Sequence, residues 1–132
     1  MNREGILRIG PAGMRGTVPG GLSPQTAMAY TAALGTYLEG GRVALAGDTR
    51  ISTGLFRHAA LSSLLAAGCR VVDAGTVSAP ELHWLVPEIG ADGGLLIGGC
   101  HHPMGWNVLS PLAADGAFFN SVRTQELLDL YH

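Results

Sequence analysis

The pattern of apolar and polar positions divides this chain into alternating strand-like and helix-like blocks. Short apolar runs bounded by glycine or polar residues predict strands at Ile6–Gly10, Arg42–Ala46, Arg70–Asp73 and Gly94–Ile97. Apolar residues at helical spacing predict helices from Ser23-Pro24 to about Leu38, from Ser52 to about Ala67, from Ala79-Pro80 to an interruption near Pro87, and from Ser121 to Tyr131.

The predicted helix boundaries rest on residues with known terminal preferences. Ser23 offers a hydroxyl cap, and Pro24 suits the first helical position. Gly40 and Gly68 are expected to end the first two helices. Ser52 is expected to cap the second helix.

Strands and helices that alternate through short connections favour right-handed βαβ units. We therefore expect an α/β protein, with a largely parallel sheet and helices on both of its faces. The 132 residues are expected to form one domain, residues 1–132.

Composition narrows the classes of partner. Charged residues make up 14% of the chain, against about 25% in typical domains, so either much of the surface is covered by partners or it is unusually poor in charge. The net charge is −2 and all eight basic residues are arginines, which gives no basic stripe for nucleic acid. No apolar run has the length of a membrane span. Two cysteines, Cys69 in the expected core and Cys100, favour a reducing, cytoplasmic compartment.

The chemistry-bearing residues gather after the last predicted strand. Gly98 and Gly99 form a tight turn, and Cys100, His101 and His102 follow. Such a turn presents side chains at the carboxyl edge of a sheet, where open α/β sheets bind ligands. A thiol beside an imidazole can also become an activated nucleophile. No metal site is predicted, because adjacent residues rarely all point at one ion.

Five motifs resemble those of the phosphohexomutases, the phosphoglucomutase and phosphomannomutase family. The segment from Cys100 to Ser110 is similar to that family's S-H-N-P followed by Y-N-G-x-K, in which the serine carries the transferred phosphoryl group. Four further matches, in the same order, start at Gly10 (G-T-S-G-I-R-G), Leu22 (L-T-P-E), Ala46 (G-x-D-T-R-x-S) and Asp73 (D-x-G-x-x-x-T-P). The resemblance covers nearly the whole chain but only the first of the family's four domains. It implies a three-layer α/β/α sandwich around a mostly parallel four-stranded sheet.

The resemblance also assigns roles to residues. Cys100, His101 and Arg15, in a glycine-flanked loop, stand at catalytic positions. Four residues stand in the phosphate loop: Gly98, Gly99, His102 and Ser110. Asp48 and Arg50 are expected to support the site through an ion pair.

The departures from the family pattern weigh on activity. Cys100 stands at the phosphoserine position, and Ser110 stands at the position of the catalytic lysine. The family's Mg²⁺ is held by aspartates of the second domain, so no cofactor is expected in this chain alone and Mg²⁺ is expected only if the other domains are joined to it. The sugar-binding loops belong to the third and fourth domains.

Three interpretations remain open. The chain is a mutase domain, inactive in isolation, whose partners are a phosphosugar and the remaining domains. Alternatively, it is a non-catalytic binding or assembly module that self-associates into a homo-oligomer. A third interpretation is a thiol-dependent enzyme that uses Cys100 and His101.

Overall fold

The computed structural model describes residues 5–10, 13–98 and 105–132. In this part of the chain the strands are β1 (Leu7–Gly10), β2 (Gly13–Thr17), β3 (Arg42–Gly47), β4 (Arg70–Thr76), β5 (Gly93–Gly98) and β6 (Trp106–Ala113). The helices are α1 (Pro24–Tyr37), α2 (Ile51–Ala66), α3 (Ala79–Glu88) and α4 (Ser121–Tyr131). The predicted α/β class is confirmed, and each of the four predicted helices is present.

The sheet differs from the expected one in size and direction. Its described strands are six rather than four, in the order β1-β2-β6-β5-β3-β4. The β3–β4 and β3–β5 pairings are parallel. The β1–β2, β2–β6 and β5–β6 pairings are antiparallel. The expectation of a mostly parallel sheet is therefore wrong, since the two unpredicted strands, β2 and β6, bring the antiparallel pairings.

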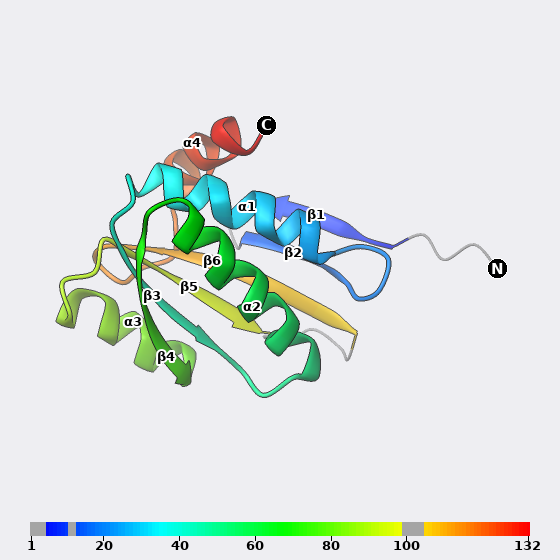
Figure 1. The fold of residues 1–132 in the computed structure, drawn as a ribbon, viewed down its shortest axis with the longest axis horizontal. Helices are drawn as coiled ribbons and strands as arrows, with labels where there is room; N and C mark the ends of the chain where they lie inside the picture. Colours follow the sequence, from blue (N-terminus) through cyan, green and yellow to red (C-terminus); the bar gives the residue numbers. More distant parts are fainter. Residues whose placement is uncertain (1–4, 11–12, 99–104) are drawn as a thin grey trace.

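Helices cover both faces of this sheet, which makes the α/β/α sandwich. Figure 1 looks onto the face crossed by α1 and α2. Their side chains Tyr30, Leu34 and Phe56 bury against Leu45 of β3 and Leu95 of β5. The opposite face is packed by α3, whose buried residues Leu82 and Val86 lie with residues of the central strands. Helix α4 packs on α1, where the Tyr30 and Tyr131 rings meet edge to face at 5.9 Å.

Local chemistry explains where α1 and α3 begin. The Ser23 hydroxyl accepts a hydrogen bond from the Thr26 amide at 3.1 Å, as expected for the cap of α1. In α3, Ser78 and Glu81 form a reciprocal capping box. That helix was expected to break near Pro87, but it continues through it to Glu88. The proline lies in the last turn, so its missing amide removes one bond close to the end of the helix.

The cap expected for α2 and the burial expected for the strand after Cys69 are both corrected by the structure. Ser52 does not cap α2, because the cap position belongs to Arg50 and no side chain caps it. Cys69 is buried as expected, at 5% exposure, but the strand that follows it, β4, lies at the sheet edge and is largely exposed.

Pro111 occupies an unusual place, inside the central strand β6. Its carbonyl accepts a hydrogen bond from the Phe119 amide at 3.3 Å. In an antiparallel strand the N–H and C=O of one residue point to the same side. The side that lacks an N–H therefore faces residue 119 rather than β5, and the β5–β6 ladder loses no bond.

Candidate functional site

The carboxyl ends of β3, β4 and β5 meet at one edge of the sheet. A cavity of about 220 Å³ opens there, lined by Asp48 after β3, Gly98 at the end of β5 and Ser110 of β6. Val77, Ser78 and Ala79, at the start of α3, complete its wall together with Leu96, Ile97 and Val108. Such edges are where open α/β sheets bind ligands.

Asp48 is the most heavily bonded side chain of this edge. One of its oxygens accepts from the Arg50 amide at 3.0 Å and from the Thr53 hydroxyl at 2.5 Å. The other lies 3.6 Å from Arg50 Nε, which confirms the expected ion pair. Its own amide donates to the Ile97 carbonyl at 3.0 Å. The turn between β3 and α2 is therefore joined to the end of β5.

Gly98 is required at the end of β5 by the closeness of this carboxylate. A Cβ at position 98 would lie 2.7 Å from Asp48 Oδ2 and 2.9 Å from its Cγ. No side chain fits there unless Asp48 moves, so a residue expected in the phosphate loop also has a steric role.

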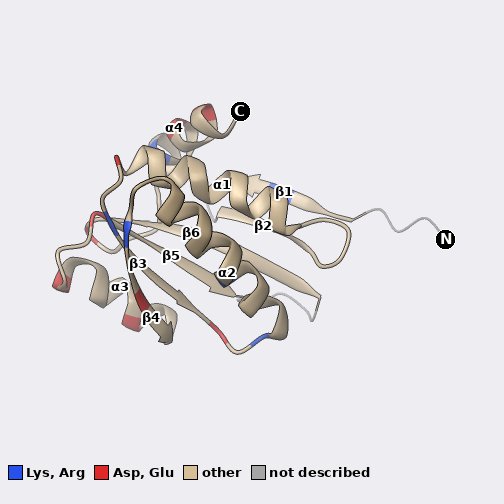
Figure 2. Cartoon of the chain, viewed as in Figure 1, with Lys and Arg blue, Asp and Glu red and all other residues tan. Residues whose placement is uncertain are grey.

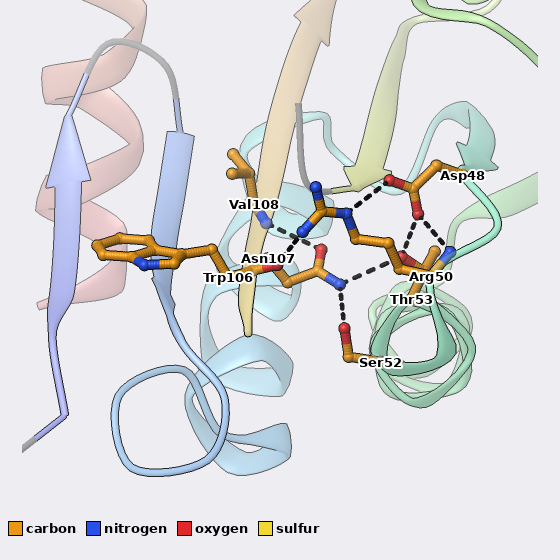
Figure 3. Close-up of polar contacts among 7 residues, drawn as sticks. All are labelled: Asp48, Arg50, Ser52, Thr53, Trp106, Asn107 and Val108. Carbon is orange, nitrogen blue, oxygen red and sulfur yellow. Dashed lines mark hydrogen bonds and ion pairs between the residues drawn. The ribbon is translucent and has the colours of Figure 1, made fainter. Parts of the chain in front are cut away.

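Asn107 extends the network onto β6 (Figure 3). Its amide nitrogen donates to Ser52 Oγ at 2.8 Å and to Thr53 Oγ1 at 3.2 Å, while its oxygen accepts from the Val108 amide at 2.9 Å. Arg50 donates to the Trp106 carbonyl at 3.2 Å, and the indole ring points away from the network. The first turn of α2 thus holds the end of β5 through Asp48 and the start of β6 through Arg50 and Asn107.

Sequence reasoning missed Asn107 and Thr53. Both are fully or almost fully buried, with exposures of 0% and 1%. A polar residue inside the apolar run W-N-V-L was an available signal, because a buried amide must find partners. Asn107 also stands at the asparagine of the family's Y-N-G-x-K pattern.

The other predicted site residues divide into two groups. Ser110 is 4% exposed in β6 and lines the cavity. Arg15 was expected in a loop but lies in β2, half-buried, opposite Arg8 of β1 and Val108 of β6. Gly99, Cys100, His101 and His102 lie outside the described residues. The structure therefore gathers Asp48, Arg50, Gly98 and Ser110, with Arg15 two strands from Gly98.

A carboxyl group at the start of α3, near the site, has a shifted pKa. The Ser78 hydroxyl and amide donate to Glu81 Oε1, which lowers the pKa of this carboxyl below its ordinary value. Burial, followed by the negative charge of Asp92, raises the pKa of the Cys69 thiol. Cys69 precedes the first residue of β4, at the opposite edge of the sheet from the cavity. It therefore has no place in the site.

Neither a metal-binding cluster nor a membrane-spanning helix is present in the described part of the chain. Its residues contain no group of three or more His, Cys, Asp or Glu side chains that could hold a metal ion. No helix among them combines the length and apolarity needed to cross a bilayer.

Comparison with known proteins decides the family. The model of "Phosphoglucomutase/phosphomannomutase, alpha/beta/alpha domain I" matches residues 7–132. The chain belongs to this family. The resemblance seen in the five sequence motifs is thereby confirmed, and the match is to the first domain, as expected.

Individual family members agree with this assignment. A "Probable phosphoglucosamine mutase" of Methanopyrus kandleri is 39% identical over 119 residues, which are 90% of this chain and 26% of that protein. A "Phosphoglucomutase/phosphomannomutase" of Thermococcus kodakarensis is 32% identical over 128 residues, covering 93% of this chain and 28% of that protein. The chain therefore spans about a quarter of the length of these curated relatives.

A solved structure shows the same fold. The crystal structure of a "putative phosphomannomutase" from Thermus thermophilus superposes with a TM-score of 0.88 at 26% identity. The superposition covers 96% of this chain and 30% of that one. The six-stranded mixed sheet is therefore the fold of a phosphomannomutase-type first domain.

Proposed function

We propose that this chain acts as the N-terminal domain of a phosphosugar mutase, which moves a phosphoryl group between oxygens of a hexose or hexosamine phosphate. The observation that carries the proposal is the domain I match over residues 7–132. The names of the relatives, phosphoglucosamine mutase and phosphoglucomutase/phosphomannomutase, support this substrate class. Its partners are a phosphosugar and the remaining mutase domains, in a reducing cytoplasm.

The chain by itself is proposed to be inactive. In a transfer to Cys100, the thiolate would attack phosphorus, an S–P bond would form, and the P–O bond to the donor would break with a proton passing to the leaving oxygen. The resulting thiophosphate is a higher-energy ester than a serine phosphate, so return to the sugar is no longer balanced. Ser110 supplies neither charge nor reach where the family has a lysine. Phosphoryl transfer depends on charge neutralisation and positioning, which both substitutions weaken.

Mg²⁺ belongs to the proposal only for the assembled mutase. When bound to the aspartates of the second domain, it would neutralise phosphoryl charge. The described carboxylates of this chain do not gather into a set that fits a metal ion. The residues of this chain instead position the site, through Asp48, Arg50 and Asn107.

A second candidate, a binding or assembly module that forms homo-oligomers, is supported by exposed apolar surface. Ile51 is 98% exposed and Leu55 47% exposed. Both line a hollow of about 390 Å³ with Val18, Arg50 and Gly105. Helix α1 carries no charged residue and is tan throughout Figure 2. These surfaces suit contact with another domain or with a second copy.

Intact-mass analysis tests the proposed inactivity. The chain is incubated with glucose 1,6-bisphosphate and Mg²⁺, beside Cys100→Ala and a Cys69→Ala control. We expect no gain of mass in any of the three. A gain of one phosphoryl group in the wild type and in Cys69→Ala, but not in Cys100→Ala, would overturn inactivity and make Cys100 the acceptor. Light scattering separates the second candidate, since a monomer at high concentration contradicts self-association.

A further inference from the structure

The carboxyl end of β4 is weakly supported by the sheet itself. β4 is an edge strand, so its hydrogen-bonding partner within the sheet is β3 on one side only. The parallel pairing with β3 also jumps from Asp73 to Gly75, which leaves Ala74 as an extra residue. A bulge of this kind disrupts the ladder locally and bends the strand. The end of β4 therefore needs support from outside the sheet.

This end of β4 leads directly into one wall of the candidate cavity. Val77, Ser78 and Ala79 all line the 220 Å³ cavity, and Val77 follows Gly75 after a single residue. Bulges are common next to active sites, where they re-aim side chains. Because so little chain separates the bulge from the wall, the position of the bulge sets the position of the wall.

The guanidinium group of Arg57, in the second turn of α2, holds the bulge at two points. Its Nη1 forms an ion pair with Asp73 Oδ1, and its Nη2 donates to the Gly75 carbonyl at 2.6 Å. Asp73 Oδ1 also accepts from the Gly75 amide at 2.9 Å. Gly75 has a φ of +71°, a conformation that favours glycine. One side chain thus binds both residues that flank Ala74.

Arg57 is built into the fold. Its side chain is 17% exposed, whereas that of Asp73 is 47% exposed. A Cβ at Gly47 would lie 3.1 Å from Arg57 Nη2, so the guanidinium group lies directly over the end of β3. Hydrogen bonds from a planar guanidinium group combine charge with a fixed geometry. This contact is therefore suited to fixing a position, beyond adding attraction between α2 and β4.

The contact completes a series that α2 makes with the strands around the cavity. Thr53 lies four residues before Arg57, so the two side chains project from the same side of the helix. Thr53 donates to Asp48, after β3, and accepts from Asn107 of β6. Arg57 adds β4 to this series. The same helix thus holds the wall at residues 77–79 and the strands on the other side of the cavity.

We propose that Arg57 is a positioning residue, which fixes the bulge of β4 through Asp73 and Gly75 and so sets the cavity wall formed by residues 77–79. The inference rests on the proposed function in treating this cavity as a substrate site. Arg57 itself lies outside the five motifs that indicated the family. Its contacts also give the D-x-G letters of one motif a physical reason, since the carboxylate binds Arg57 and the glycine adopts the positive φ.

Backbone NMR of the whole 132-residue chain tests this role without any ligand. The variants are Arg57→Gln, Asp73→Asn and the double variant, with Arg57→Lys as the conservative replacement. Arg42→Gln is the matched control, because Arg42 donates to the Ile89 carbonyl at the other end of α3. Arg42 therefore also holds α3, but away from the cavity.

We expect Arg57→Gln and Asp73→Asn to shift the amide signals of residues 76–79 in the same direction. The double variant should shift them no further, because the two side chains act through one contact. Arg57→Lys keeps the charge and should restore part of the change. Arg42→Gln should leave these signals unaltered.

The Glu81 carboxyl group distinguishes a displaced wall from a frayed helix. Its pKa is lowered by the hydrogen bonds from Ser78, and this capping box is local to the start of α3. If Arg57 positions the wall, the pKa of Glu81 stays low in Arg57→Gln while the signals of residues 76–79 move. Unmoved signals in Arg57→Gln, or a Glu81 pKa that rises to its ordinary value, would overturn the positioning role.

Titration with glucose 1-phosphate, followed at the Val77 and Ser78 amides, separates this role from the proposed function. We expect Arg57→Gln to bind about tenfold more weakly than the wild type, as is typical when an outer residue that orients a binding group is lost. Equal affinity in the two proteins would overturn the role. A wild type that does not bind, beside a variant whose wall is displaced, would weaken the proposed function and leave the positioning role standing.

Discussion

Replacing Asn107 with alanine tests whether the network between α2 and β6 stabilises the site. The substitution removes two donor bonds, to Ser52 and Thr53, and the acceptor of the Val108 amide. The Val108 N–H keeps its ladder partner on β5, where Val108 is in register with Gly98, so it loses only a second acceptor, at a cost of about 0.5–1 kcal/mol. Ser52 borders solvent and recovers a partner, whereas Thr53 loses about 0.5–1.5 kcal/mol. We expect a total loss of about 1–2.5 kcal/mol.

Urea unfolding followed by far-UV circular dichroism measures this loss. Ser23→Ala, which removes the cap of α1 away from the network, is the control and should cost about 1 kcal/mol. An Asn107→Ala loss no larger than that of the control, at an unchanged denaturant slope, would refute the reasoning. A Thr53→Val variant and the double variant then give the coupling between the two side chains, which should be non-additive.

Three further predictions concern single residues. Gly98→Ala should destabilise the fold by about 1–3 kcal/mol, because the new methyl group meets the Asp48 carboxylate. The control Gly54→Ala, in a helix with open space around it, should be neutral or stabilising, and urea unfolding compares the two variants. Cys69 should react with iodoacetamide only slowly at neutral pH, because burial raises its pKa, and mass spectrometry should show fast labelling once urea unfolds the chain. Glu81 has a lowered pKa, so its contribution to stability is present above its unfolded-state pKa and is lost as the pH falls through its folded-state pKa. The melting temperature of Glu81→Gln should therefore decrease less steeply below about pH 4.5 than that of the wild type.

The helices could be predicted because their signals are local. Ser23 and Pro24 mark the start of α1, and the range 121–131 predicted for α4 is the range observed. The Asp48–Arg50 ion pair was also predictable, since both residues lie in one short turn. Each of these features depends on residues that are close in sequence.

The missed features depend on contacts across the sheet. Strand β2 reads G-M-R-G-T, in which two glycines imitate a loop. Strand β6 is buried on both faces and contains Pro111, so it shows no alternation. The cap expected at Ser52 was wrong because α2 begins at Ile51, and the Ser52 hydroxyl instead accepts from Asn107, 55 positions away. Pairing in register, which brings Arg8 beside Arg15, has no signal within either segment.

The antiparallel pairing of β5 with β6 has a consequence for how this family can change its chemistry. Six residue pairs, from Gly93–Ala113 to Gly98–Val108, fix the two strands against each other, and α2 holds both of their ends. Any segment of suitable length that leaves Gly98 and returns at Trp106 therefore starts and finishes at the same points in space. We expect such a segment to be exchangeable: replacing it with the corresponding segment of another family member should leave the scaffold unaltered.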